Sequence, residues 1–443
     1  MEIKRILIAN RGEIALRALR TIKEMGKEAV VVYSTADKDA LYVKYADVAI
    51  CIGKERSSDS YLNIPAIISA AEISEADAIF PGYGFLSENQ NFVEICSHHK
   101  LKFIGPSVAA MALMSDKSKA KQMMQRAGVP VIPGSDGAVA DTKAAKELAK
   151  KIGYPIILKA AAGGGGRGMR VVEREEDIEK AFWSAESEAM SAFGDGTMYM
   201  EKYILNPRHI EVQVIGDSHG NVLHIGERDC SMQRRHQKLI EESPAILLDD
   251  DTRARLHETA IKAAKAIGYE GAGTFEFLVD KNLDFYFIEM NTRLQVEHCV
   301  SEMVSGLDII ELMIKVAQGE ALPPQESITL KGHAIECRIT AEDPNTFTPS
   351  PGKITKYVCP GGRNVRMDSH IYQDYSIPPY YDSMIGKLIV WDTDRNRAIR
   401  KMKVALEQLV IGGIKTTRDF HIAMMENQDF IDNNYDTNYL SRR

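Results

Sequence analysis

The sequence predicts a protein of several domains that combines α/β and α+β architecture. With 443 residues, the chain exceeds the length that one hydrophobic core usually supports. Strand-like and helix-like segments alternate up to about residue 110, whereas residues 204–319 are typical of antiparallel strands covered by helices. A hydrophobic content of 44% and a charged content of 26% are those of an ordinary globular protein.

The N-terminal part of the chain favours a parallel α/β domain. Apolar runs at residues 5–9, 29–33 and 78–80 are typical of buried strands, and Pro65 opens a helix between the last two of them. The loop of residues 81–85 follows the third strand at its carboxyl end, where open α/β sheets bind ligands. A simple turn without function is an equally good interpretation of this loop alone.

Proline and glycine separate the remaining units of the chain. A helix from residue 116 leads into a stretch rich in both residues, and residues 131–203 are typical of a small α+β unit. Residues 280–284 predict the turn of a hairpin between strands 274–279 and 285–290. We therefore expect domains at residues 1–114, 115–330 and 331–443, with the α+β unit of residues 131–203 inside the second.

A run of glycines at residues 163–168 satisfies the dinucleotide-binding pattern G-x-G-x-x-G and has the spacing of a Walker loop. Both of those motifs require a helix after the glycines, but residues 169–172 are typical of a strand, which excludes a dehydrogenase. We expect instead the tip of a hairpin that begins with strand 156–160 and closes over phosphates. Lys159 and Arg167 supply positive charge there. A hairpin tip without function is the alternative.

Polar residues alternate along residues 289–297 with the period of a strand. Glu289, Asn291, Arg293, Gln295 and Glu297 would share one face, because successive side chains on an extended strand point to opposite faces. A half-buried strand with a solvated side is the alternative, but the acidic, amide and cationic mixture is what a metal-assisted anion site needs. A fully extended segment would span ~26 Å. The segment therefore bends or serves two adjoining sites, and we favour adjoining sites.

Two acidic residues of the predicted hairpin indicate a metal site. Glu276 and Glu289 lie on its two arms, and neighbouring carboxylates repel each other unless a cation binds them. Together with Asn291 they offer the oxygen ligands that suit magnesium, which normally bridges to substrate phosphates. Two exposed strand acids are the alternative, which the neighbouring Phe275 and Phe287 make less favourable.

A second polar cluster occupies residues 227–238 and contains four cations. Taken alone, such a charge run is typical of a solvated face. His209 and His236 are likewise, in isolation, more typical of surface or core histidines than of ligands.

Composition excludes several classes of partner. The net charge of -7 and the pI near 5.9 give no support for binding to nucleic acid or to a membrane surface. No apolar stretch approaches the ~20 residues of a membrane helix, and we expect no signal peptide and a cytoplasmic location. The six cysteines are scattered, which favours reduced thiols.

Five motifs together resemble the biotin carboxylases, which are ATP-grasp enzymes. These are residues 8–15, residues 81–89, the glycine hairpin, residues 227–238 and residues 289–298. The resemblance implies an N-terminal α/β domain, an ATP-grasp domain with a mobile lid at about residues 131–203, and a C-terminal α+β domain. It implies ATP- and bicarbonate-dependent carboxylation of biotin through carboxyphosphate, as the first half-reaction of an acetyl-CoA carboxylase.

The resemblance also implies a role for each matching residue. Glu297 would be the base that deprotonates bicarbonate, and its pKa is expected to be low beside two cations. ATP would contact Lys117, Lys159, Gly165, Gly166, Glu201, Lys202, Tyr203, Ile204, His209, Gln233, His236, Glu276, Leu278 and Glu289. One or two magnesium (or manganese) ions would bind Glu276, Glu289 and Asn291. Bicarbonate would contact Lys238, Arg293, Gln295, Val296 and Arg338, with Lys238, Arg293 and Arg338 also catalytic, and biotin would lie beside Tyr83 and Arg338.

The expected partners are a separate biotin carboxyl carrier protein, carboxyltransferase subunits and a second copy of the chain. Met402-Lys403 is a near miss to the biotin-attachment motif but is typical of a long helix, so we expect no biotin on this chain. Three alternatives stay open: the same half-reaction for a pyruvate or other acyl-CoA carboxylase, another ATP-grasp carboxylate ligase, and a nucleotide-binding regulatory subunit without turnover.

Overall fold

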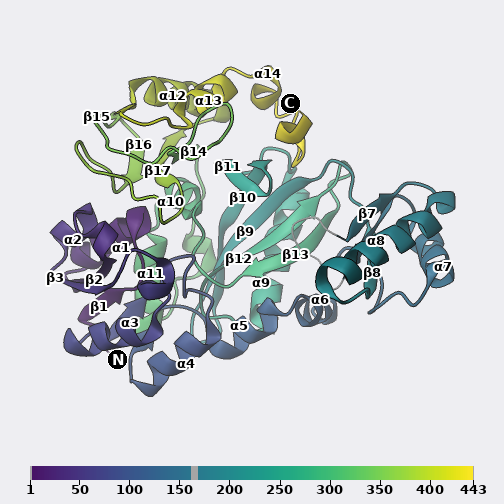
Figure 1. Ribbon diagram of the computed structural model, residues 1–443, viewed down its shortest axis with the longest axis horizontal. Coiled ribbons are helices and arrows are strands. Elements are labelled where there is room, and N and C mark those ends of the chain that lie inside the picture. Colours follow the sequence, from purple (N-terminus) through teal and green to yellow (C-terminus); the bar gives the residue numbers. More distant parts are fainter. Residues whose placement is uncertain (1, 161–167, 443) are drawn as a thin grey trace.

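Four sheets organise the computed structural model, which describes residues 2–160 and 168–442 (Figure 1). The first is a five-stranded parallel sheet of order β3-β2-β1-β4-β5, as predicted for the N-terminal part. Its central strands are buried except at Arg5, the first residue of β1, because helices cover both faces. The elements are β1 (Arg5–Ile8), α1 (Gly12–Glu24), β2 (Glu28–Ser34), α2 (Leu41–Tyr45), β3 (Val48–Gly53), α3 (Ile64–Ile73), β4 (Ala78–Phe80), α4 (Gln90–His98) and β5 (Lys102–Phe103).

A small lobe, residues 131–203, projects to the right of the molecule in Figure 1. Its three-stranded antiparallel sheet has the order β7-β6-β8, and the pairing of Ile156 with Val172 confirms the predicted hairpin. The expected tip, with Gly165, Gly166 and Arg167, lies outside the described residues. Two helices, α5 (Val108–Ser115) and α6 (Lys117–Arg126), lead to this lobe, which contains α7 (Thr142–Ile152), β6 (Ile156–Ala160), β7 (Met169–Val172), α8 (Ile178–Phe193) and β8 (Met198–Lys202).

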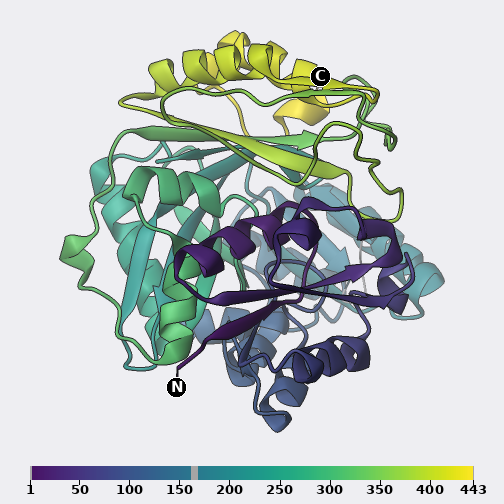
Figure 2. The same ribbon diagram turned by 90° about the vertical axis from the view of Figure 1, so that its left-hand side faces the viewer.

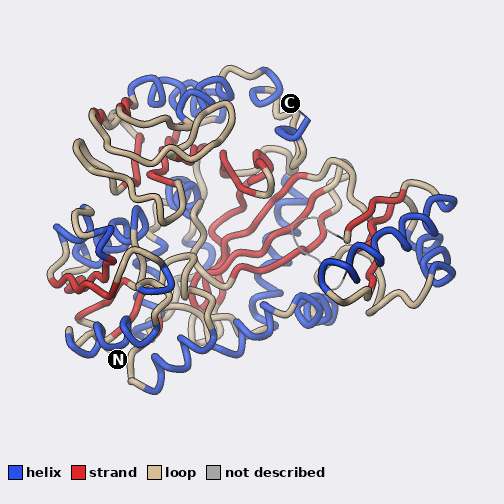
Figure 3. Tube along the Cα trace, in the orientation of Figure 1, coloured by secondary structure: helices blue, strands red, loops and turns tan. Residues whose placement is uncertain are grey.

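The largest sheet has eight strands in the order β13-β12-β9-β10-β11-β14-β17-β16, all antiparallel. Its long strands cross the centre of Figure 3, as the sequence predicts for residues 204–319. The predicted hairpin turn at residues 280–284 is confirmed. The elements are β9 (Arg208–Gly216), β10 (Val222–Arg234), β11 (Gln237–Ser243), α9 (Asp250–Ala266), β12 (Gly271–Val279), β13 (Phe285–Asn291), α10 (His298–Ser305) and α11 (Ile309–Gln318).

The C-terminal strands extend this sheet beyond β11. Because β14 pairs with β11, the sheet continues across the expected domain boundary at residues 330/331. Figure 2 shows the C-terminal helices over one face of these strands and the N-terminal domain on the other side. The elements are β14 (His333–Thr340), β15 (Lys356–Val358), β16 (Val365–Ser369), β17 (Met384–Asp392), α12 (Arg395–Gln408), β18 (Val410–Gly412), α13 (Arg418–Met425) and α14 (Gln428–Ile431).

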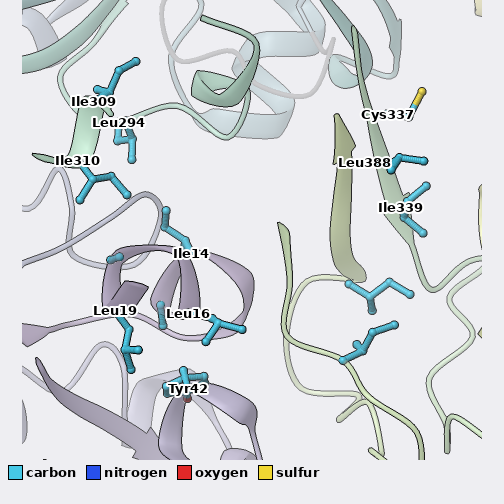
Figure 4. Close-up of a cluster of buried hydrophobic side chains, with 14 of the residues drawn as sticks. Ile14, Leu16, Leu19, Tyr42, Leu294, Ile309, Ile310, Cys337, Ile339 and Leu388 are labelled. Atoms are coloured by element: carbon cyan, nitrogen blue, oxygen red, sulfur yellow. The ribbon is translucent and has the colours of Figure 1, made fainter. Parts of the chain in front are cut away.

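One hydrophobic cluster joins the N-terminal domain to the large sheet (Figure 4). It contains Leu16 and Leu19 of α1, Ile309 and Ile310 of α11, and Leu294, which lies just beyond β13 and is fully buried. This cluster therefore holds the chain that follows β13 at a defined place. Among the described residues, no helix is long and apolar enough to cross a membrane.

Candidate active site

The strand period of residues 289–297 holds only as far as Asn291, where β13 ends, and the bend that the sequence left open follows it. Residue 293 is a bend, and residues 296 and 297 form the turn into α10. The cause is tertiary packing, because Leu294 inserts into the core instead of alternating across a strand. The guanidinium of Arg293 donates to Asn291 Oδ1 at 2.9 Å and to Gln295 Oε1 at 3.1 Å. The polar groups thus converge by a bend and not along one extended face.

Two acids from adjacent strands have the arrangement expected of a metal site. Glu276 of β12 is directly opposite Glu289 of β13, so both side chains leave the same face of the sheet. Asn291 Nδ2 donates to Glu276 Oε1 at 2.8 Å. Burial raises the pKa of Glu276, but Lys238 and His209 outweigh it, and the pKa falls well below its usual range. Carboxylates and an amide on one face fit magnesium, which prefers oxygen ligands.

Lys238 of β11 connects Glu276, an expected metal ligand, to Glu297, the expected base. Its Nζ donates to Glu211 at 2.6 Å, to Glu276 at 3.0 Å and to Glu297 at 2.7 Å. Burial opposes the charged form, but the three carboxylates dominate and raise the pKa of Lys238 well above its usual value. One ammonium group therefore touches both halves of the site.

Glu297 is completely buried between cations. Its Oε2 accepts a hydrogen bond from Arg338 Nη2 at 3.0 Å, and its Oε1 accepts the one from Lys238. Burial alone raises the pKa of this carboxyl, but Lys238, Arg338 and Arg228 hold it well below its usual value, as expected. Glu297 is consequently ionised at neutral pH, the state that a base requires.

Arg293 and Gln295 are fixed at the rim of the same site. Glu88 accepts a hydrogen bond from Arg293 Nε at 2.9 Å, and Gln295 Nε2 donates to Glu276 Oε1 at 3.1 Å. The carbonyl of Val296 accepts from Lys387 Nζ of β17 at 2.8 Å. The C-terminal strands thus help to hold the turn that carries Glu297.

The described residues expected to contact ATP belong to two parts of the fold, the large sheet and the small lobe with the adjacent α6. Lys159 of β6 donates to Glu201 of β8 at 2.6 Å, and Lys121 of α6 donates to it at 3.0 Å. Lys117 is exposed, with its Nζ 3.9 Å from Glu289. His209 lies 2.9 Å from Glu276 and is opposite Leu278 in the register of β9 and β12. Gln233, near the end of β10, and Ile204 are buried, whereas His236 is exposed in the β10–β11 turn. The backbone N–H of Tyr203 donates to the carbonyl of Pro155.

The polar groups of Lys202 and Tyr83, which we expect to lie beside ATP and biotin, are hydrogen-bonded to groups of the protein itself. Lys202 Nζ donates to the carbonyls of Gly153 and Tyr154 at 3.1 and 2.7 Å, so its side chain braces the small lobe. The hydroxyl of Tyr83 donates to Glu13. The backbone carbonyl of Tyr83 accepts from Asn10 at 2.8 Å, which joins the loop after β4 to the loop after β1.

Taken alone, the charge run at residues 227–238 indicated a solvated face, and that interpretation is wrong for most of the run. These residues form β10, the turn after it and the start of β11, and most of β10 is buried. Arg228 is fully buried, where its guanidinium donates to Glu211 at 2.6 Å and to Gln213 at 2.8 Å. Oppositely charged and hydrogen-bonding partners take the place of the water that would otherwise solvate these side chains, and such pairing is the condition for burying a charge run.

Sequence reasoning missed Glu211, which binds both Lys238 and Arg228. A signal was present, because His209, Glu211 and Gln213 alternate with Ile210 and Val212 along β9. It also missed Glu241, whose Oε1 accepts from Arg338 Nε at 2.6 Å.

Comparison with known proteins agrees with this geometry. Residues 2–111 match the family description "Biotin carboxylase, N-terminal domain", residues 116–325 match "Carbamoyl-phosphate synthase L chain, ATP binding domain", and residues 336–442 match "Biotin carboxylase C-terminal domain". The biotin carboxylase of Nostoc sp. is 56% identical over 442 residues, with 99% of each chain covered.

Two solved structures have the same fold throughout. The Campylobacter jejuni biotin carboxylase–β-γ-ATP complex is 84% identical, with a TM-score of 0.93 and coverage of 100% of this chain and 99% of that one. The biotin carboxylase domain dimer of Hydrogenobacter thermophilus 2-oxoglutarate carboxylase, in complex with MgADP, ADP and bicarbonate, is 49% identical, with a TM-score of 0.90 and coverage of 100% and 98%.

A small antiparallel lobe beside a long antiparallel sheet, with paired acids on the sheet, defines an ATP-grasp enzyme. The chain belongs to the biotin carboxylase family.

Proposed function

We propose that this chain carboxylates biotin at the expense of ATP and bicarbonate, through carboxyphosphate. The observation that carries the proposal is the contact of one ammonium group, Lys238, with both Glu276 and Glu297. It joins a site suited to metal and phosphates to a buried base, so that phosphoryl transfer and deprotonation of bicarbonate take place next to each other.

In this mechanism, Glu297 accepts the proton of bicarbonate, whose oxygen then attacks the γ-phosphate of ATP, so that carboxyphosphate forms and ADP leaves. Carboxyphosphate breaks down to carbon dioxide and phosphate, the phosphate takes the ureido proton of biotin, and the biotin nitrogen attacks the carbon dioxide. Lys238, Arg293 and Gln295 hold the anion, together with the backbone of Val296. Glu276, Glu289 and Asn291 would bind magnesium, which supplies neutralising charge to the phosphates when it is bound. Arg338, adjacent to Glu297, stabilises the developing enolate of biotin, with Tyr83 beside the ring.

The same proposal takes the remaining nucleotide contacts from the resemblance of the sequence motifs to those of the family. Residues of the small lobe would hold ATP from one side and residues of the large sheet from the other. The lobe would close as a lid and exclude water, which otherwise destroys carboxyphosphate. The proposed contacts are Lys117, Lys159, Gly165, Gly166, Glu201, Lys202, Tyr203, Ile204, His209, Gln233, His236 and Leu278.

The proposal extends to domains and partners. The domains would be residues 1–114, 115–330 and 331–443, and the biotin would be carried by a separate carrier protein in the cytoplasm. Carboxyltransferase subunits and a second copy of the chain are the further proposed partners. Acetyl-CoA is the proposed final acceptor, and pull-down of the native partners tests it against other acyl-CoA substrates and pyruvate.

Measurement of ADP release tests the reaction. We expect magnesium-dependent release that bicarbonate supports and free biotin stimulates. Absence of any response to biotin, while a known biotin carboxylase responds in the same assay, would contradict the proposal. A screen of other carboxylates without biotin distinguishes another ATP-grasp ligase, and a complete lack of turnover with retained ATP binding would indicate a regulatory subunit.

A further inference from the structure

Two glutamates lie directly behind Arg338 and have no role in the mechanism above. Glu241 of β11 and Glu336 of β14 are opposite each other in the antiparallel register. Opposite residues share one face of a sheet, with Cβ atoms about 5 Å apart. Both side chains are completely buried.

Three of the four oxygens of this pair have no hydrogen-bond partner among the described residues: Glu241 Oε2 and both oxygens of Glu336. The fourth, Glu241 Oε1, accepts from Arg338 Nε at 2.6 Å. A buried carboxylate without a partner is very unfavourable, and two ionised carboxylates side by side repel each other. One proton between them removes both penalties.

Among the described residues, the cations that face Glu336 are bonded to other groups. Lys387 Nζ donates to the Val296 carbonyl at 2.8 Å and lies 3.3 Å from Glu13, and Arg338 is shared by Glu241 and Glu297. Burial raises the pKa of Glu336 well above its usual value and that of Glu241 to about 7. The charged and titratable groups that face the pair are Lys238, Glu297, Arg338 and Lys387, with the thiols of Cys230, Cys299 and Cys337.

We propose that Glu241 and Glu336 share one proton and together act as positioning residues for Arg338. The protonated Glu336 donates to Glu241 Oε2, which leaves Glu241 Oε1 to hold Arg338 Nε while Arg338 Nη2 reaches Glu297. This inference rests on the proposed function, which gives Arg338 its role toward biotin.

The arrangement has a consequence at alkaline pH. Release of the shared proton to water places a second negative charge behind Arg338. The guanidinium is then drawn back from Glu297, and the biotin-dependent rate falls.

The pH profile of kcat/KM for biotin tests this consequence with the Glu336→Gln variant. Glutamine cannot ionise, and its amide N–H still donates to Glu241. We expect the alkaline fall of the wild type to disappear in this variant. Glu242→Gln is the matched control, because Glu242 is buried on the same strand but is paired with Arg395 and His333, and it should keep the alkaline fall. An alkaline fall that persists in Glu336→Gln, or is absent from the wild type, would overturn the proposal.

A second variant separates positioning from a merely structural role. Glu241→Gln removes the charge that holds Arg338, so kcat/KM for biotin should fall about ten- to a hundredfold, the worth of a hydrogen bond to a charged group. The Kd for ATP should stay at the wild-type value, as measured by calorimetry. An equal loss of ATP binding would contradict positioning of Arg338.

Infrared spectroscopy detects the shared proton without catalysis. The wild type at neutral pH should show the carbonyl band of a buried carboxylic acid, which Glu336→Gln loses and Glu242→Gln keeps. Absence of the band from the wild type would overturn the proposal. A chain that shows the band but does not carboxylate biotin would refute the proposed function while the shared proton stands.

Discussion

At the scale of single residues, the site depends on charges that are buried only because they are paired. Glu297, Glu276 and Glu211 surround one ammonium group, that of Lys238, and each carboxylate has a further partner. Removal of one of these charged side chains leaves its neighbours unpaired in the protein interior, which solvates charges poorly. Substitutions that keep the side-chain shape are therefore the informative ones.

The two acids at the ends of residues 289–297 should have separable effects. Glu289→Gln should weaken magnesium-dependent ATP cleavage, because it removes a proposed metal ligand. Glu297→Gln should leave ATP binding intact and lower bicarbonate-dependent ADP release about a hundredfold or more, the usual contribution of a general base. Calorimetry of ATP binding and an ADP-release assay measure the two steps. Equal loss of ATP binding in both variants would show that the two sites are one.

The buried side chain of His370 should make the free energy of unfolding depend on pH. Burial, together with the charge of Arg11, lowers its pKa to about 3. The folded state thus excludes a proton that the unfolded state binds below pH ~6.5, so stability is complete above that pH and declines as the pH falls. His370→Phe keeps a ring beside Tyr375. The decline between pH 7 and 5.5, measured by urea denaturation, should be about 1 kcal/mol smaller in this variant. An identical decline in both proteins would contradict a neutral buried His370.

At the scale of elements, the decisive segment is the irregular one between β13 and α10. Its backbone is placed by Leu294 in the hydrophobic core and by the hydrogen bond from Lys387 to Val296. The C-terminal strands and the N-terminal domain therefore both contribute to the position of Glu297, although neither carries it.

Leu294→Ala should loosen this segment. We expect a loss of about 3 kcal/mol in the free energy of unfolding, typical of a buried Leu→Ala change, and a raised KM for bicarbonate. Leu256→Ala on α9 is the control, because Leu256 is equally buried but belongs to a different cluster. It should lose similar stability without a change in the KM for bicarbonate. A shared rise in KM would mean that general destabilisation is the cause.

At the scale of the whole molecule, one antiparallel sheet runs from β13, beside the small lobe, to the C-terminal β16. Its strands deliver Glu276, Lys238 and Arg338 from three segments far apart in the sequence. In the proposed function, biotin reaches these groups on a separate carrier protein and is not attached to this chain.

Accordingly, the purified chain should give no band on a streptavidin blot. Met402 is fully buried in α12, and Lys403 of the same helix lies 2.7 Å from Glu426. A helix does not present a lysine as the hairpin tip of a carrier domain does. A biotinylated carrier protein run beside it provides the positive control, and a band from the chain would refute this prediction.

The local patterns of the sequence predicted much of the fold. Continuous apolar runs at residues 5–9 and 29–33 predicted buried parallel strands, and the turn at residues 280–284 predicted the hairpin that aligns Glu276 with Glu289. The five-residue polar alternation indicated groups that the structure brings together, and it left open the bend that follows Asn291, because period-2 polarity also arises where an irregular segment is held by tertiary contacts.

By itself, the sequence determined the types of side chain that are present: paired acids, amides, cations and glycines between two strands. These side-chain types follow from local composition and spacing, which can be read from the sequence without the fold. Only the tertiary structure decided that Lys238 contacts three carboxylates, that Glu211 and Glu241 belong to the site, and that residues 292–297 bend. Those features depend on the register between distant strands and on where Leu294 is buried, and both are set by packing across the whole molecule.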